Sequence, residues 1–220
     1  MGELPFSSEQ FLEVFGKYNL DVWPMQILLY FLGIAAFILT VFRLKNSASY
    51  INGILAFMWL WMGVAYHWWH FAPVNPAAYL FGILFVLQGL IFLWFSIFRS
   101  DRLVYKFNLS LSGIAGILFL LYAFLIYPRL SAHFGHSYPQ SPTFGLPCPT
   151  VIFTFGILLF AGKAFPKFVA FIPFLWSLIG FSAAISLGIK EDIGLIVAGI
   201  SGLILLFFKF RQKPRNLARI

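Results

Sequence analysis

The sequence predicts an all-α protein: a polytopic membrane helix bundle with seven transmembrane helices, its N-terminus outside the cytoplasm and its C-terminus inside. Three observations support this prediction. Of the 220 residues, 61% are apolar, 20% aromatic and only 10% charged, whereas charged residues make up roughly a quarter of a soluble domain. Seven apolar runs each approach the roughly 20 residues that a helix needs to cross a bilayer. Lysine and arginine gather between alternate runs, which indicates the orientation.

Residues 1–21 are expected to form an amphipathic interfacial helix on the membrane surface. Phe11 and Phe15 recur at helical spacing, Ser7 or Ser8 is a candidate N-cap, and glutamates lie on the opposite side. The segment has neither a basic beginning nor a continuous apolar core, so we do not expect a cleavable signal peptide. The first transmembrane helix would then serve as the insertion signal.

The predicted transmembrane domain covers residues 22–208. Its seven spans are Val22 to Phe42, Tyr50 to Phe71, Pro76 to Phe98, Phe107 to Tyr127, Leu146 to Phe165, Phe168 to Ile189 and Ile193 to Phe208.

The fifth span is the least regular of the seven. Its unbroken apolar run begins only at Val151, and Lys163 lies near its other end. To reach roughly 20 residues it must include Pro147 and Cys148, which draws the end of the preceding loop into the membrane. A re-entrant hairpin formed by segments five and six is the alternative.

The orientation follows from the distribution of charge. With the N-terminus outside, twelve of the fifteen basic residues face the cytoplasm, and six of the seven acids face outward. The tail, residues 209–220, carries five of these positive charges and no acid, so we expect it to anchor the topology and to contact anionic lipids. Because the basic residues lie between apolar runs, without a groove-reading motif, the net charge of +8 does not indicate a nucleic-acid partner.

Polar and small residues inside the spans predict helix contacts. Gln88 lies near the middle of the third span and needs a partner in the bundle, because an unpaired amide is costly in hydrocarbon. Ser112 with Gly116, and Ala198 with Gly202, have the small-xxx-small spacing of packed membrane helices.

The four histidines form two HxxH pairs, His67 with His70 and His133 with His136. On an α-helix, residues i and i+3 share a face, so an HxxH pair can coordinate one metal ion through neutral imidazole nitrogens. The topology puts both pairs at the outer side, the second within a Pro/His-rich loop, residues 128–150. We expect proline to make this loop a rigid lid over the bundle.

Cys148 is the fifth candidate metal ligand. It precedes Pro149 at the expected start of a helix, where the helix dipole favours thiolate. Imidazoles and a thiolate suit copper or zinc, and carboxylates from Asp21, Glu191 or Asp192 would complete a zinc or iron site. Bis-histidine haem ligation is a further option.

A structural role for the same residues stays open. Histidines beside Trp68 and Trp69 are ordinary at a membrane interface, and a buried cysteine is usually a small apolar residue. The sequence shows no Ser-His-Asp constellation, P-loop or nucleotide fingerprint. It also suggests no paired intramembrane carboxylates of the kind that proton pumps use.

Three stretches resemble a family of bacterial multi-pass membrane proteins of unknown function. They are LPFSSEQFLEVFGKYNLDVWP, WMGVAYHWWHFAPVNPAAYLFGILFVLQGLIFLW and PTFGLPCPTVIFTFGILL. The resemblance covers most of the chain, and its most specific parts are residues 75–78 and 147–149. It implies a bacterial inner-membrane protein and supplies no activity or site residue.

The sequence thus leaves three hypotheses for function. The first is a protein that handles a metal ion or small solute at its outer face, as a transporter or accessory channel. The second is a membrane-embedded metalloenzyme or haem-bearing redox subunit, and the third is a structural subunit of a membrane complex. The first predicts that the four histidines and Cys148 converge under the outer loop.

Overall fold

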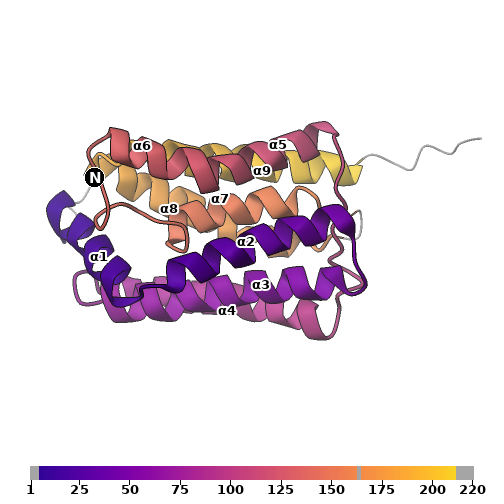
Figure 1. Cartoon of the computed structure of the whole chain (residues 1–220), viewed down its shortest axis with the longest axis horizontal. Helices are drawn as coiled ribbons and strands as arrows, with labels where there is room; N and C mark the ends of the chain where they lie inside the picture. The colour runs from indigo at the N-terminus through magenta and orange to yellow at the C-terminus, as the bar shows by residue number, and fades with distance from the viewer. Residues whose placement is uncertain (1–4, 163–164, 212–220) are drawn as a thin grey trace, which may run out of the picture.

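The chain folds as a bundle of long helices that lie roughly along one axis (Figure 1). The computed structural model describes residues 5–162 and 165–211, with side chains through residue 209. The elements are α1 (Ser8–Asp21), α2 (Met25–Phe42), α3 (Ser47–Trp61), η1 (Met62–Phe71), α4 (Ala78–Ile97), α5 (Leu111–Leu121), η2 (Tyr122–Ile126), α6 (Tyr127–His133), α7 (Pro147–Leu158), η3 (Lys167–Ala170), α8 (Phe171–Leu187), η4 (Lys190–Asp192) and α9 (Ile193–Arg211).

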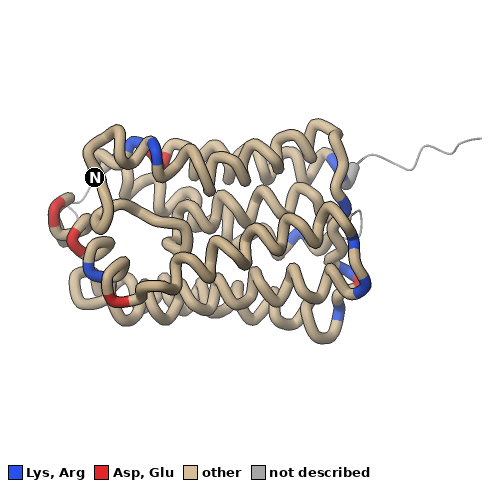
Figure 2. Tube along the Cα trace, in the orientation of Figure 1, with Lys and Arg blue, Asp and Glu red and all other residues tan. Residues whose placement is uncertain are grey.

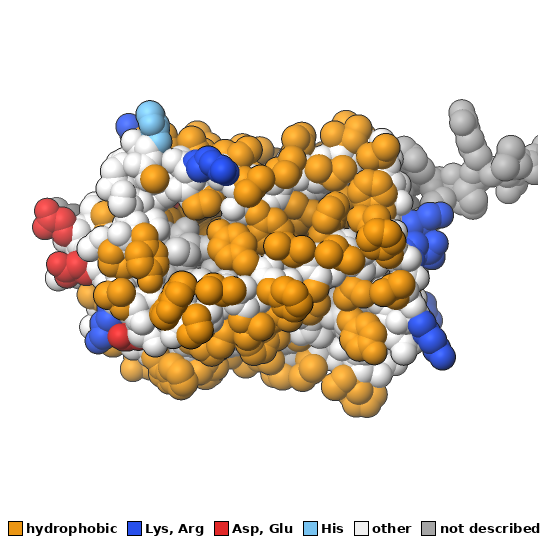
Figure 3. All heavy atoms as spheres, viewed as in Figure 1, with side chains coloured by type: hydrophobic (Ala, Val, Ile, Leu, Met, Phe, Trp, Pro, Cys, Tyr) orange, Lys and Arg blue, Asp and Glu red, His pale blue; other side chains and the backbone are white. Residues whose placement is uncertain are grey.

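Six helical runs among the described residues are long and apolar enough to cross a membrane, which indicates a multi-pass membrane protein. They are Met25–Phe42, Ser47–Phe71, Ala78–Ile97, Leu111–His133, Lys167–Leu187 and Lys190–Lys209. Large apolar side chains cover the sides of the bundle between its two ends (Figure 3). Six of the seven predicted spans therefore correspond to long helices, while the seven-span topology stays a prediction.

The fifth predicted span, Leu146 to Phe165, is wrong as a continuous helix. Only α7 is helical, and its 12 residues extend about 18 Å at 1.5 Å per residue, short of a hydrocarbon core roughly 30 Å thick. Every residue of α7 except Cys148 is buried. The chain turns after α7 and forms an isolated antiparallel bridge between Ala161 and Tyr105. There the Lys106 N–H donates to the Phe160 carbonyl at 2.9 Å, and the Gly162 N–H donates to the Val104 carbonyl at 2.8 Å. The backbone polar groups of this segment are thus hydrogen-bonded to protein and are not exposed to lipid.

The small residues pack α7 against its neighbours, as predicted. A Cβ on Gly116 of α5 would lie 2.9 Å from the Gly156 carbonyl oxygen of α7, and one on Gly202 of α9 would lie 2.8 Å from the Phe155 ring. These close approaches explain how a helix buried on all sides fits among longer ones. Gln88 finds its partner as well, because its Nε2 donates to the Val169 carbonyl at 3.2 Å.

Helix α1 lies at one end of the bundle, beyond the end of α2 (Figure 1). Ser7 is its N-cap, in a capping box with Gln10. Phe15 and Tyr18 are buried, and Phe15 lies 6.0 Å from the ring of Tyr66 in η1. The apolar face of α1 therefore packs on the bundle, where the sequence suggested a helix resting on lipid.

The predicted outer loop is shorter than residues 128–150. Its first residues are helical, since α6 continues the helical run that begins at Leu111 and ends at His133, and its last residues belong to α7. The irregular part is tied to α1 by Asn19, whose Nδ2 donates to the Pro139 and Ser141 carbonyls at 2.6 and 2.8 Å. Burial raises the pKa of Tyr18, so its hydroxyl stays protonated and donates to the Gly145 carbonyl at 3.4 Å. These bonds hold the loop in place, as a rigid lid requires.

Charges separate to the two ends of the bundle (Figure 2). Basic residues of the α2–α3 and α4–α5 connections lie at one end, here called the basic end. The acids of α1 and η4 lie at the other end, here called the acidic end, together with a few basic residues. This is the separation that the sequence predicted. Lys163 and the predicted tail from residue 212 onward fall outside the described residues.

Candidate functional site

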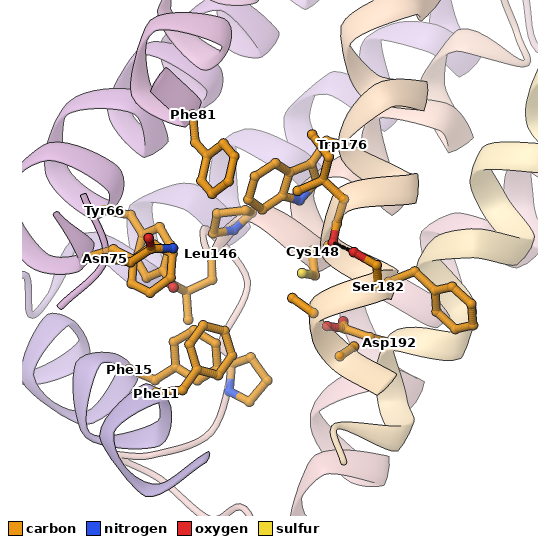
Figure 4. Close-up of a pocket in the computed structure, with 18 of the residues that line it drawn as sticks. Phe11, Phe15, Tyr66, Asn75, Phe81, Leu146, Cys148, Trp176, Ser182 and Asp192 are labelled. Atoms are coloured by element: carbon orange, nitrogen blue, oxygen red, sulfur yellow. Dashed lines mark hydrogen bonds between the residues drawn. The ribbon is translucent and has the colours of Figure 1, made fainter. Parts of the chain in front are cut away.

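A cavity of about 430 Å³ opens at the acidic end of the bundle. Its walls come from α1, η1, the start of α4, the segment before and within α7, and α8. Figure 4 shows α1 and η1 on one side of the hollow and α8 and α9 on the other. The volume falls within the roughly 300–1,000 Å³ of small-molecule sites.

The cavity is lined mainly by aromatic rings. Its aromatic lining comprises Phe6, Phe11, Phe15, Tyr66, Phe71, Phe81, Trp176 and Phe181. Beyond the aromatic residues, polar groups are few: the side chains of Asn75, Cys148, Ser182, Ser186 and Asp192. A largely apolar cavity with a few placed polar groups is typical of a site for a hydrophobic small molecule.

Asp192 and Glu191 are buried beside the cavity, in η4 at the start of α9. The Tyr127 hydroxyl donates to Asp192 Oδ1, and the Cys148 thiol makes a second hydrogen bond to the same carboxyl group. Glu191 Oε1 lies 2.9 Å from His136 Nδ1, and its Oε2 has no partner among the described residues. Each acid thus has partners from segments that are distant in sequence.

This arrangement corrects the expectation about acidic residues. The sequence placed Glu191 and Asp192 on the outer side, as optional metal ligands, and suggested no paired carboxylates within a span. Both residues belong to the candidate span Lys190–Lys209, and they are only 0% and 4% exposed. Because ionisable groups are costly inside a membrane, such a pair is a functional-site hypothesis in its own right.

The first HxxH pair is divided between two environments. His67 is buried, neither of its nitrogens has a partner among the described residues, and rings surround it, including Phe85 at 4.6 Å and Trp176 at 5.0 Å. His70 Nε2 lies 3.2 Å from Asp21 Oδ2, and its Nδ1 contacts the Ala65 carbonyl. The reason is local: residues 62–71 form a π-helix, whose wider turn separates positions that share a face in an α-helix.

The second HxxH pair is divided as well. His133 is exposed at the end of α6, while His136 turns inward to Glu191. Gly135 between them has a φ of 95°, a left-handed conformation that reverses the chain direction and that glycine adopts readily. The two imidazoles therefore do not face one ion.

Within residues 5–162 and 165–211, no three His, Cys, Asp or Glu side chains are grouped closely enough to hold a metal ion. The five predicted ligands are distributed over separate contacts: His70 with Asp21, His136 with Glu191, Cys148 with Asp192, and His67 and His133 with neither acid nor thiol. A site for copper, zinc, iron or haem stays a prediction.

Sequence reasoning missed the residues that form the cavity. Trp176, Tyr66 and Asn75 sit in apolar segments or turns, where a single aromatic or amide carries no pattern of its own. The acids offered a signal, since a pair directly before a long apolar run marks the start of a helix that must bury or solvate them. Asn75 belongs to one of the stretches that carry the family resemblance.

Comparison with known proteins supports this resemblance. The model of a family described as "Family of unknown function (DUF6064)" matches residues 8–216, so the chain belongs to this family. No curated protein and no solved structure matches the chain. The match confirms the predicted resemblance to a family of unknown function, while a bacterial inner membrane stays a prediction.

Proposed function

We propose that this DUF6064 protein is an integral membrane protein that binds a small hydrophobic solute in the cavity at its acidic end. The observation that carries the proposal is the cavity itself, about 430 Å³ in volume and lined by aromatic rings. Of the functions that the sequence suggested, this proposal retains the handling of a small solute. The alternatives are the handling of a metal ion, a metalloenzyme or haem-bearing redox subunit, and a structural subunit of a membrane complex.

The proposed orientation puts the cavity at the outer face of an inner membrane. Lysine and arginine are enriched on the cytoplasmic side of membrane proteins, and the basic end collects the charged connections α2–α3 and α4–α5. Seven crossings with the N-terminus outside require α7 and the chain after it to complete the fifth passage. The burial of α7 by other helices supports this passage, since irregular backbone at membrane depth needs protein around it.

The charge of the acidic end supports a neutral solute. Asp21 is paired with His70, and Asp192 accepts hydrogen bonds from Tyr127 and Cys148. The carboxyl groups of Asp21 and Asp192 therefore have protein partners, and the apolar rings provide most of the surface that a solute would contact. Burial of an apolar ligand there contributes on the order of 25 cal/mol per Å² of apolar surface removed from water.

The experiment is a binding measurement on purified protein in nanodiscs. N-phenyl-1-naphthylamine, a neutral dye, is excited by energy transfer from tryptophan so that dye in free lipid contributes little. Ala183→Phe places a ring inside the cavity, because Ala183 lines it and is half-buried. Ala35→Phe on α2 is the matched control, at a half-buried alanine outside the cavity lining.

We expect Ala183→Phe to weaken dye binding at least tenfold and Ala35→Phe to leave it within twofold of the unaltered protein. Circular dichroism and thermal unfolding must show that both variants fold. Equal binding by the two variants, or no transfer signal in the unaltered protein, would overturn the proposed function.

A further inference from the structure

We infer that the solute is a lipid-soluble quinone: a flat ring with two opposed carbonyl oxygens and an apolar tail. This inference rests on the proposed function and names the ligand class for the same cavity. It depends on three features of the cavity: hydrogen-bond donors on opposite walls, aromatic surfaces between them, and an opening towards lipid.

The first donor is the indole N–H of Trp176 in α8. Trp176 lines the cavity and is only 6% exposed. Its Nε1 has no nitrogen or oxygen acceptor among the described residues and faces only the Cys148 sulfur, which is a weak acceptor. Buried donors usually have a full hydrogen-bond partner, and a ligand oxygen in the cavity would supply a stronger acceptor than this sulfur.

Further donors lie on the opposite wall, in η1 and the turn after it. Figure 4 places Tyr66 and Asn75 on one side of the cavity and Trp176, Cys148 and Asp192 on the other. Asn75 Oδ1 already accepts from the Ala77 N–H at 3.1 Å, which leaves its Nδ2–H₂ group to donate. Tyr66 adds a hydroxyl to the same wall. Donors on two facing walls match a ring that carries an acceptor oxygen at each end.

The surfaces between these donors are aromatic. Phe11 and Phe15 of α1 and Phe81 of α4 contribute rings to the lining, and such rings favour stacked or edge-to-face contacts with a flat conjugated ligand. A carbonyl oxygen would be repelled by a free carboxylate, but Asp192 accepts from Tyr127 and Cys148. The lining thus suits a neutral acceptor better than an anion.

The cavity opens towards lipid along α8. Ser182, Ile185 and Ser186 line it and are also exposed, within the candidate span Lys167–Leu187. On the side of α1, Ser8 Oγ donates to the Leu187 carbonyl at 3.1 Å, and this bond joins the start of α1 to the end of α8 across the rim. A ring inside the cavity could therefore keep its apolar tail among the acyl chains.

The test uses displacement of N-phenyl-1-naphthylamine by two competitors with the same tail: 2,3-dimethoxy-5-methyl-6-decyl-1,4-benzoquinone and decylbenzene, which lacks carbonyls. We expect the quinone to compete at least tenfold better than decylbenzene. If both compete equally, the cavity binds apolar solutes and the quinone assignment fails. If the dye itself does not bind, the proposed function fails first.

Variants then locate the donor. Trp176→Phe removes the N–H and keeps an aromatic ring, and Tyr66→Phe removes only a hydroxyl. Each is expected to weaken the quinone by about threefold to tenfold, the effect of one lost hydrogen bond, without changing decylbenzene. Trp94→Phe is the control, at a tryptophan that is 54% exposed on α4. Unchanged quinone affinity in both folded cavity variants, or equal losses for both competitors, would contradict the assignment.

Discussion

The contribution of the buried Asp192 contact to stability can be tested by removing one oxygen atom, the Tyr127 hydroxyl. Tyr127→Phe removes the hydroxyl that donates to Asp192 Oδ1 and keeps the ring in its place. The two side chains are almost fully buried, at 1% and 4% exposure. Water reaches Asp192 only from the cavity that this residue lines, so it replaces the lost donor only in part.

The expected loss follows from what remains around Asp192. A hydrogen bond to a charged group contributes about 1.5–3 kcal/mol, and the Cys148 thiol is a weak donor that stays in place. We therefore expect Tyr127→Phe to lower the free energy of unfolding by about 2 kcal/mol, close to a 30-fold change in the unfolding equilibrium.

The assay is reversible unfolding by sodium dodecyl sulfate in mixed micelles, followed by circular dichroism. Tyr50→Phe is the matched control, because Tyr50 is 58% exposed and surface changes usually stay within about 0.5 kcal/mol. Asp192→Asn and the double variant complete a cycle, and a direct bond predicts that the two losses are not additive. A Tyr127→Phe loss no larger than that of Tyr50→Phe would refute the reasoning.

Two further predictions concern topology and metal. Both cysteine variants are made in a Cys148→Ala background, and intact cells are treated with an impermeant maleimide. We expect Glu13→Cys to be labelled at once and Lys45→Cys only after permeabilisation, because the positive-inside rule places the basic end in the cytoplasm. The reverse labelling pattern would show the opposite orientation. The metal prediction requires stoichiometric copper, zinc or iron, or a haem absorption band, that disappears when His67 and His133 are both replaced by alanine. Equal metal content in the two proteins would contradict it.

The long helices could be predicted because the bilayer fixes their length and polarity. A run such as Ala78–Ile97 must be apolar throughout and about 20 residues long, and both properties are read directly from the sequence. The bilayer does not set the length of α7, because α7 is surrounded by protein. For a helix buried on all sides, the 12 residues of α7 suffice, and the turn and bridge after it are hydrogen-bonded to Val104 and Lys106.

The five candidate metal ligands are not grouped together among the described residues, for reasons that spacing does not reveal. The HxxH argument assumed an α-helical turn, but the backbone around His67 is π-helical, as the bond from the Ala72 N–H to the His67 carbonyl at 2.9 Å shows. This bond joins the carbonyl of residue i to the N–H of residue i+5, as in a π-helix. His67 and His70 therefore point in different directions. Nothing in YHWWHF distinguishes the two helix types, since the choice follows from how η1 packs against α1 and α4.

The histidines of the acidic end nevertheless share a structural role. His70 pairs with Asp21 at 3.2 Å and so links η1 to the end of α1, while His136 pairs with Glu191 at 2.9 Å and links the outer loop to η4. Each pair joins two segments that wall or roof the end of the bundle where the cavity lies. The sequence placed both histidine pairs at one end of the bundle, and the carboxylates that it offered as additional metal ligands are the partners of His70 and His136. These polar contacts hold the segments around the cavity in place, and the aromatic rings provide the surface that we propose binds a solute.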